Sequence, residues 1–134
     1  MTKLCHRHCI ACRPRDEAGF GLRFDPQPDG SVEAAFDCDA RYQGYASQVH
    51  GGVIALLHDA AMTHCLFARQ ILAVTAKLSI RFERPVAIDT PARIRAWIAD
   101  DSPPAYRLES EIIQGGAVKS SAEAMFYEQD NLSH

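Results

Sequence analysis

The strongest constraint on this fold is a long helix-forming stretch that is apolar on nearly every side. From Gly51 to about Arg69 the chain reads GGVIALLHDAAMTHCLFAR, with no proline and no run of β-branched residues. A helix of about five turns with apolar residues all round is a buried helix, not a surface one. Any fold of this chain must therefore surround residues 51–69 with other elements.

Four segments after this helix show the two-residue alternation of half-buried strands. They cover residues 74–82, 92–98, 106–114 and 118–126, with apolar residues at most of the alternate positions. Turn-forming breaks at Pro85, at residues 101–104 and at Gly115-Gly116 separate them, so consecutive strands should pair antiparallel. Two shorter strands are predicted before the helix, at residues 21–24 and 31–36, joined by the turn cluster DPQPDG.

These elements predict an α+β fold with the order β-β-α-β-β-β-β. The simplest packing curls the antiparallel sheet, by its apolar face, around the long helix. A length of 134 residues suits one domain. We place this domain at residues 19–128 and expect residues 1–18 to be an irregular segment rich in Cys and His. A long strand at a sheet edge is hazardous if left bare, which favours pairing of sheets between subunits.

Composition and charge exclude several classes of protein. A net charge of −3 gives no basic surface for nucleic acid, so no nucleic-acid partner is expected. No apolar run approaches the roughly 18 residues of a membrane span, so no membrane partner is expected. The N-terminal MTKLCHRHC lacks the apolar core of a signal peptide, which predicts a cytoplasmic protein.

The cysteines leave one alternative open. The N-terminal segment contains five residues of the types that bind zinc: Cys5, Cys9 and Cys12, with His6 and His8 between the first two. Four of these side chains could converge on a metal ion. No second Cys or His pair follows at the distance typical of zinc fingers. We therefore favour a reduced N-terminal segment without metal, and we expect no cofactor.

Asp59 is the unusual residue of the helix. Its neighbours one turn away on the same face are Ala55, Leu56, Met62 and Thr63, none of which is basic. A carboxylate in such surroundings costs several kcal/mol unless a distant group satisfies it. It either lies on a narrow solvent-facing stripe or accepts a backbone hydrogen bond, or it acts chemically.

The start of the helix favours a chemical role. The first backbone N–H groups of a helix have no partner within it, and the helix dipole adds positive potential there. Gly51 and Gly52, which have no side chains, would let a ligand approach these donors and would stabilise an oxyanion. His50 either caps the helix or positions substrate.

The stretch YQGYASQVHGGVIALLHDAAM, followed by AVTAKLSIRFERPV, resembles the hotdog-fold acyl-CoA thioesterases, in the branch similar to phenylacetate-pathway thioesterases. The resemblance covers residues 19–127. It implies a hotdog fold in which a curved sheet wraps the helix and two protomers join their sheets, with active sites at the interface and dimers that pair into tetramers. It also implies hydrolysis of an acyl-CoA or acyl-carrier thioester to the free acid and thiol.

The resemblance assigns roles where the positions match. Asp59 would be the nucleophile or the general base, and the N–H of Gly51 the oxyanion donor. Thr75 would position water or the carboxylate across the dimer. Relatives often carry Asn or Gln where this chain has Gly44, so the adjacent Gln43 is the candidate for that role.

Further candidates concern substrate binding. Gly52 and Met62 are expected to contact substrate, and Arg81 and Arg84 to bind the phosphates of coenzyme A. The acyl group is open between aromatic and aliphatic, because pocket depth depends on packing. Two alternatives are a non-catalytic acyl-CoA-binding or regulatory protein and a hotdog hydratase or dehydratase.

Overall fold

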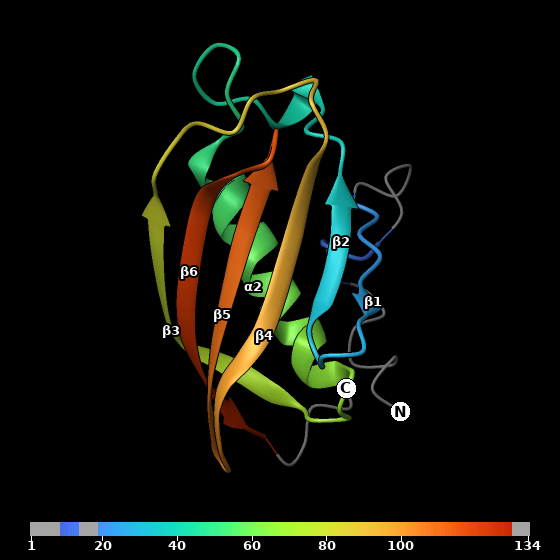
Figure 1. The fold of residues 1–134 in the computed structure, drawn as a ribbon, viewed down its shortest axis with the longest axis vertical. Coiled ribbons are helices and arrows are strands. Elements are labelled where there is room, and N and C mark those ends of the chain that lie inside the picture. Colours follow the sequence, from blue (N-terminus) through green and yellow to red (C-terminus); the bar gives the residue numbers. More distant parts are fainter. Residues whose placement is uncertain (1–8, 14–18, 130–134) are drawn as a thin grey trace.

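The computed structural model describes residues 9–13 and 19–129. The elements in chain order are β1 (Asp25–Pro26), β2 (Val32–Phe36), the 3-10 helix η2 (Ala40–Tyr42), α2 (Gly51–Phe67), β3 (Ala73–Phe82), β4 (Ala92–Ser102), β5 (Ala105–Gln114) and β6 (Ala117–Glu128). The strands form a six-stranded sheet in the order β1-β2-β4-β5-β6-β3, and each neighbouring pair is antiparallel. Figure 1 shows this sheet with α2 behind it.

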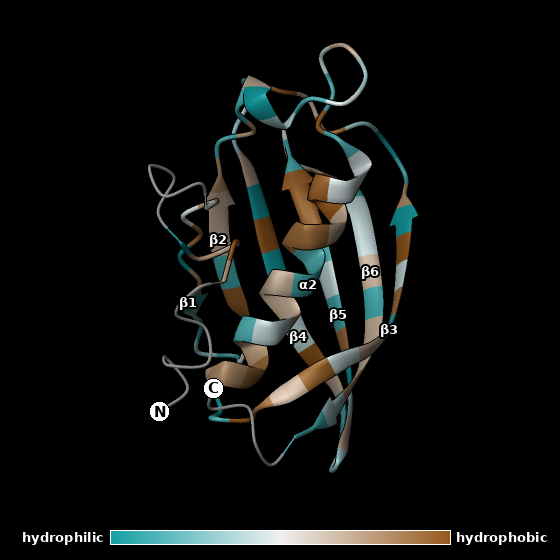
Figure 2. Cartoon of the chain, turned by 180° about the vertical axis from the view of Figure 1, so that it is seen from behind, coloured by the Kyte–Doolittle hydropathy of each residue, from teal (hydrophilic) through white to brown (hydrophobic). Residues whose placement is uncertain are grey.

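The core lies between α2 and the concave face of the sheet. Seen from behind, α2 lies in front of the strands and carries apolar bands along its length (Figure 2). Every second residue is buried along β2, the first half of β4, β5 and the middle of β6, among them Phe36, Ile94, Leu108 and Phe126. The predicted hotdog architecture, with one long helix wrapped by an antiparallel sheet, is confirmed. Within the described residues, no helix combines the length and apolar character needed to cross a membrane.

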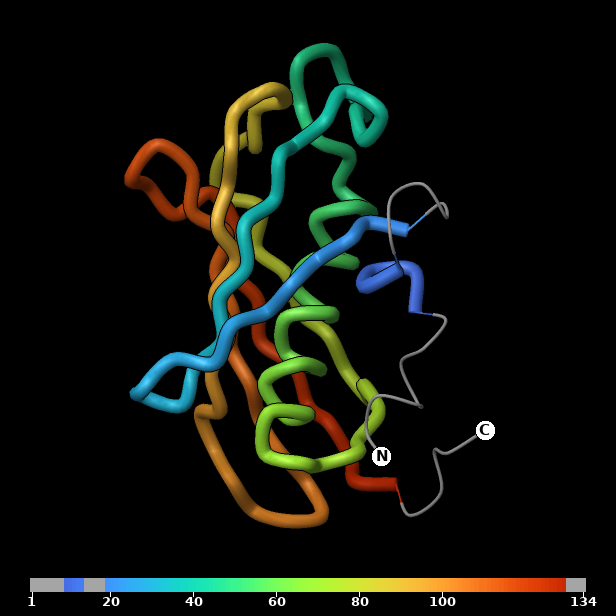
Figure 3. The backbone as a smooth tube through the Cα atoms, turned by 90° about the vertical axis from the view of Figure 1, so that its right-hand side faces the viewer, coloured from blue at the N-terminus to red at the C-terminus, as the bar shows by residue number. Residues whose placement is uncertain are grey.

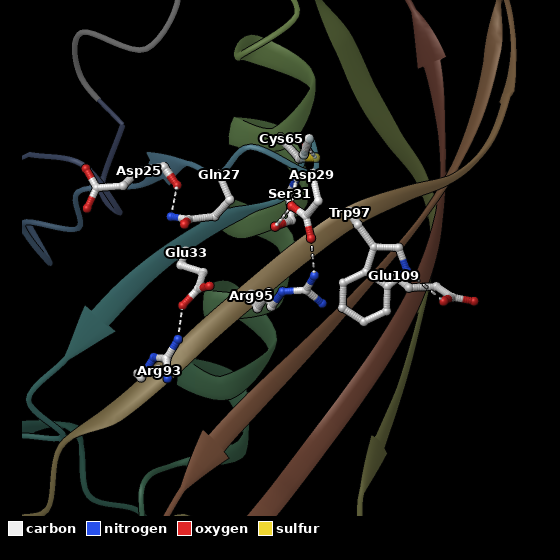
Figure 4. Close-up of polar contacts among 11 residues, drawn as sticks. Asp25, Gln27, Asp29, Ser31, Glu33, Cys65, Arg93, Arg95, Trp97 and Glu109 are labelled. Carbon is white, nitrogen blue, oxygen red and sulfur yellow. Dashed lines mark hydrogen bonds and ion pairs between the residues drawn. The ribbon is translucent and has the colours of Figure 1, made fainter. Parts of the chain in front are cut away.

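The convex face of the sheet is polar and carries paired charges (Figure 4). Arg93 is paired with Glu33, and Arg95 with Asp29 at 2.8 Å. The guanidinium of Arg95 also lies over the ring of Trp97, at 4.9 Å from its centroid. Exposed ion pairs contribute little to stability, so this face is solvated and the fold depends on the other face.

The first strand is not where the sequence predicted it. Residues 21–24 form no strand, and β1 instead occupies Asp25–Pro26, inside the predicted turn cluster. The segment binds the N-terminal turn: Phe20 N–H donates to the carbonyl of Ile10 at 2.8 Å, and Leu22 N–H to that of Ala11 at 2.9 Å. Ala11 is buried in the core, so this turn packs on the domain. The division at residue 19 stays a prediction, because residues 1–8 and 14–18 lie outside the described chain.

The two edges of the sheet differ greatly. One edge is β1, with two residues, and the other is β3, with ten. In Figure 1, β3 crosses behind the lower part of the other strands and then rises along the outer edge of the sheet. Most of β3 is exposed, including Val74 and Phe82, with Phe82 at 56%. A bare edge of this length is a natural site for pairing with another strand.

His58 is a fully buried histidine in the middle of α2. Its Nδ1 lies 2.6 Å from the hydroxyl of Ser110 on β5, and its Nε2 lies 2.8 Å from that of Ser120 on β6. The Ser120 hydroxyl donates to the carbonyl of Arg81, so it accepts from His58, and Nε2 carries the proton. Nδ1 then accepts from Ser110. The imidazole is a satisfied core group, and burial lowers its pKa to about 4.

We expect stability to fall in acid because of His58. The unfolded chain binds a proton at His58 near pH 6.5, whereas the folded protein binds it only near pH 4, so folding loses stability as pH falls between these values. The full decrease in the free energy of unfolding is about 3 kcal/mol. His58→Gln should remove this part of the pH dependence while keeping hydrogen bonds to the serines. Urea unfolding of both proteins from pH 8 to pH 4 measures it, and parallel profiles would contradict the assignment.

Candidate active site

The N-terminus of α2 presents one free backbone donor. His50 is the N-cap residue, and its Nδ1 accepts a hydrogen bond from the N–H of Gly52 at 2.8 Å. The predicted availability of Gly52 as a donor is therefore wrong. Among the hydrogen bonds of the described residues, the N–H of Gly51 has none, and Gly51 is exposed. This donor points out at the positive end of a five-turn helix, where a developing oxyanion is stabilised.

The loop before α2 explains why this chain has Gly44 rather than Asn or Gln. A Cβ at Gly44 would lie 3.0 Å from the Cα of His50, so no side chain fits without moving the cap residue. The neighbouring Gln43 pairs with Val49 in an isolated bridge and accepts from the N–H of Ser47 at 3.3 Å. The backbone of residues 43–50 thus folds back on itself and holds His50 at the helix start.

A cavity of about 790 Å³ opens at this end of the helix. Its lining includes His50 and Gly51 at the helix start, Phe82 at the end of β3, and Arg84 just after it. The ring of Phe82 comes within 3.7 Å of the Cβ position of Gly51. The remaining lining residues are Gln43, Gly44, Tyr45, Gln48, Val49, Ile54, Glu83, Pro85 and Val86. The free donor therefore borders a space of the size that holds small ligands.

The carboxylate of Asp59 is fixed by β3. The hydroxyl of Thr75 donates to Asp59 Oδ1 at 2.5 Å. Asp59 is half-buried, and its backbone carbonyl accepts from the hydroxyl of Thr63 at 2.9 Å. Thr75 thus contacts the carboxylate of its own chain, and a role in positioning water or the carboxylate across a dimer stays a prediction. This hydrogen bond leaves the second carboxylate oxygen to act on a substrate.

Gly51 and Asp59 of one chain cannot act on the same atom. Eight helical residues at 1.5 Å each put their backbones about 12 Å apart along the axis. Reacting groups must lie within about 3–3.5 Å. A substrate carbonyl held by Gly51 is therefore out of reach of Asp59 in the same chain.

Two other predicted site residues lie elsewhere. Met62 is completely buried in the core and lines none of the cavities found in the described chain, because its helix face packs on the sheet. Arg81 points to the convex face, where it borders a hollow with Trp97 and Glu109, because alternation along β3 sends it away from the helix. Only Arg84 of the two predicted phosphate-binding arginines lines the cavity with Gly51.

The N-terminal cysteines show no assembled metal site. Cys5 lies outside the described residues, and among the described ones no group of three His, Cys, Asp or Glu side chains could hold a metal ion. Cys12 instead lies against His64 of α2, which the sequence reasoning did not single out. Phe82 and Tyr45 were also missed as cavity residues, and only their unusual exposure marks them.

The comparisons with known proteins agree with this architecture. Residues 47–100 match the family model described as thioesterase superfamily. A crystal structure of a thioesterase superfamily protein has a TM-score of 0.84 and 27% identity; the match covers 90% of this chain and 63% of that one, less than two thirds of its length. The resemblance to this family is confirmed. The matched segment contains the helix start, Asp59 and the two strands that follow.

Two further solved structures share the fold. A mutant of the phenylacetic acid degradation protein PaaI from Thermus thermophilus has a TM-score of 0.76 and 21% identity, covering 87% of this chain and 100% of that one. A hypothetical thioesterase protein with coenzyme A from Streptococcus pneumoniae has a TM-score of 0.75 and 16% identity, covering 81% and 85%. No curated protein sequence matches this chain.

We expect His50 to contribute to stability and activity by capping the N-terminus of α2. His50→Ala should destabilise the protein by about 1 kcal/mol, because the Gly52 N–H loses its acceptor. His50→Asn, which also caps helices, should restore both the melting temperature and any hydrolytic activity of the protein. Restored stability without restored activity would show that the imidazole contacts substrate instead.

Proposed function

We propose that the protein hydrolyses acyl-CoA thioesters to the free acid and thiol, in a homodimer whose sites combine Gly51 of one subunit with Asp59 of the other. The observation that carries this proposal is a pair of polar groups on α2. Among the described residues, the backbone N–H of Gly51 has no hydrogen-bond acceptor, and the carboxylate of Asp59 is oriented by Thr75. Their separation of about 12 Å in one chain requires the second subunit.

The bare edge of β3 supports this dimer. A two-fold axis at that edge would pair β3 with its copy and set the two α2 helices antiparallel on the same face of one continuous sheet. The start of each helix would then approach a later part of the other. Phe82 and Val74, the exposed apolar residues of β3, would be covered at the same time. Pairing of such dimers into tetramers and a location in the cytoplasm stay predictions.

The chemistry follows from the two groups. The thioester carbonyl oxygen would accept from the Gly51 N–H, which stabilises the developing negative charge. One such donor is worth about 2.7–4 kcal/mol in acyl transfer. The free oxygen of Asp59 either attacks the carbonyl carbon, forming a mixed anhydride and releasing the thiolate, or takes a proton from water as the water attacks. In both routes Thr75 holds the other oxygen and so orients the carboxylate.

One observation argues against a hydratase or dehydratase that would use a histidine base. His58 is the histidine next to Asp59, and both of its ring nitrogens are hydrogen-bonded to buried serines. It is fully buried and has no access to a ligand. The carboxylate alone remains at this position.

Two substitutions separate the two groups. Asp59→Asn should lower kcat about 10²–10⁴-fold with little change in KM.

Gly51→Pro tests the backbone donor, because it removes the N–H at the first helical position. Proline is tolerated there, and His50 already has the extended backbone that precedes proline. It should lower kcat similarly. Gly51→Ala keeps the donor, and its Cβ meets only ordinary contacts, so it should stay active. An undiminished kcat in Asp59→Asn would remove Asp59 from the mechanism.

The same variants test the shared site. Inactive Asp59→Asn and Gly51→Pro chains, unfolded and refolded together, should recover about one quarter of wild-type activity. Half of the dimers formed at random are mixed, and each mixed dimer has one intact site of two. Recovery should be absent if both groups acted within one chain.

Arg84 should recognise the nucleotide end of the substrate. It lines the cavity with Gly51, whereas Arg81 three residues earlier faces the convex surface, which makes it a matched control. Arg84→Gln should raise KM for an acyl-CoA more than for the corresponding acyl-pantetheine, because only the former carries the nucleotide phosphates. Arg81→Gln should change neither. Equal effects of Arg84→Gln on both substrates would exclude a phosphate contact.

A further inference from the structure

Cys9 and Cys12 lie on one tight turn outside the proposed active site. The N–H of Cys12 donates to the carbonyl of Cys9 at 3.2 Å, and the N–H of Arg13 donates to the same carbonyl at 2.9 Å. The carbonyls of Ile10 and Ala11 between them accept from residues 20 and 22, which holds the turn in place. The turn brings the two thiols together, and they share a hydrogen bond.

An imidazole lies beside this dithiol. The Sγ of Cys12 is 2.8 Å from Nε2 of His64, in the last turn of α2. The His64 ring is stacked on Phe24 at 4.8 Å between centroids and meets the edge of Phe67 at 5.6 Å, so its orientation is fixed. Figure 3 shows the turn, in dark blue, on the side of α2 away from the sheet.

A cavity borders the site at Cys12 and His64. Cys12 and His64 line a cavity of about 560 Å³ together with Leu22, Phe24 and Asp25. Cys9 and Cys12 are only half-buried. Cys38 and Cys65, in contrast, are fully buried, and burial raises the pKa of each thiol to about 11. Among the described residues, two half-buried thiols therefore lie at this turn, and two fully buried ones serve as internal controls.

We propose that Cys9 and Cys12, with His64 as proton acceptor, form a thiol–disulfide redox site that is oxidised by hydroperoxides. The thiolate of Cys9 attacks the peroxide oxygen, giving a sulfenic acid and releasing water after protonation. The Cys12 sulfur then attacks the sulfenic sulfur while His64 takes the Cys12 proton. Hydroxide leaves and collects that proton as water. Two thiols and one hydrogen peroxide thus give one disulfide and two waters.

The order of the two steps follows from the contacts. The hydrogen bond to Cys9 and burial hold the pKa of the Cys12 thiol well above its usual range. Cys12 therefore needs the adjacent base, His64, before it can react, which makes it the thiol of the second step. This site shares no residue with the Gly51 and Asp59 site, so the inference does not depend on the proposed function.

Intact-mass measurement on the full chain tests the proposal. Brief treatment with stoichiometric hydrogen peroxide, quenched with a thiol alkylator, should give a species that has lost the mass of two hydrogen atoms, and reductant should reverse it. Peptide mapping should link Cys9 to Cys12. Cys9→Ser and Cys12→Ser should abolish the species, whereas Cys5→Ser should retain it. A link through Cys5, or two thiols that stay alkylatable, would overturn the proposal, and mapping of the wild-type chain decides even if a variant does not fold.

A second variant isolates the role of His64. His64→Gln should slow disulfide closure at pH 7 by at least about thirtyfold, the factor set by the thiolate fraction of an ordinary thiol with a pKa near 8.5, because the Cys12 pKa lies above that value. The loss should shrink as pH rises, because solvent then removes the proton. An unchanged rate, or a loss independent of pH, would exclude His64 as the proton acceptor. A chain that carries a bound zinc ion and resists peroxide would overturn the redox site altogether.

Discussion

The structure depends on how α2 is fixed inside the sheet. A helix with apolar residues on nearly every side gains burial in any rotation about its axis, so the hydrophobic effect alone does not select one. Two polar residues, His58 and Asp59, select the rotation of α2 about its axis. His58 can be buried only where Ser110 and Ser120 meet both ring nitrogens, and Asp59 only where Thr75 reaches its carboxylate. An unpaired buried polar group costs about 1–3 kcal/mol, so other rotations of the helix are disfavoured by polar groups rather than by packing.

The same helix determines what the site can be. Because α2 is rigid and continuous, Gly51 and Asp59 are held about 12 Å apart, and no side-chain motion closes that gap. A single chain then offers a donor without a nucleophile at one place and a nucleophile without a donor at another. Both become useful when a second helix lies antiparallel to the first, and the exposed length of β3 is where such a copy would join. The fold and the exposed edge of β3 are thus both compatible with the proposed dimer.

The sequence predicted the helices and strands that depend on local residue pattern. It failed for segments whose structure depends on contacts with residues far away in the chain. The alternation of β3 and the proline-free run of α2 were visible, and their observed bounds differ by no more than a few residues. Residues 21–24 alternate like a strand, yet they bind the N-terminal turn instead of the sheet. Periodicity could not predict that Arg81 and Arg84 line different hollows. That prediction requires knowing where β3 ends and the chain turns toward the cavity at the helix start.

The two proposed sites lie on one helix and can affect each other only through it. His64 follows Asp59 by five residues, about 7.5 Å along the axis and more than a third of a turn around it, so the imidazole cannot contact the carboxylate. Between them lie Met62 and other fully buried residues, in a core that does not yield continuously to small strains. The hydrogen bonds that join His58 and Asp59 to the sheet involve neither Cys9 nor Cys12. The contacts of α2 with the sheet are thus distinct from its contact with the N-terminal turn.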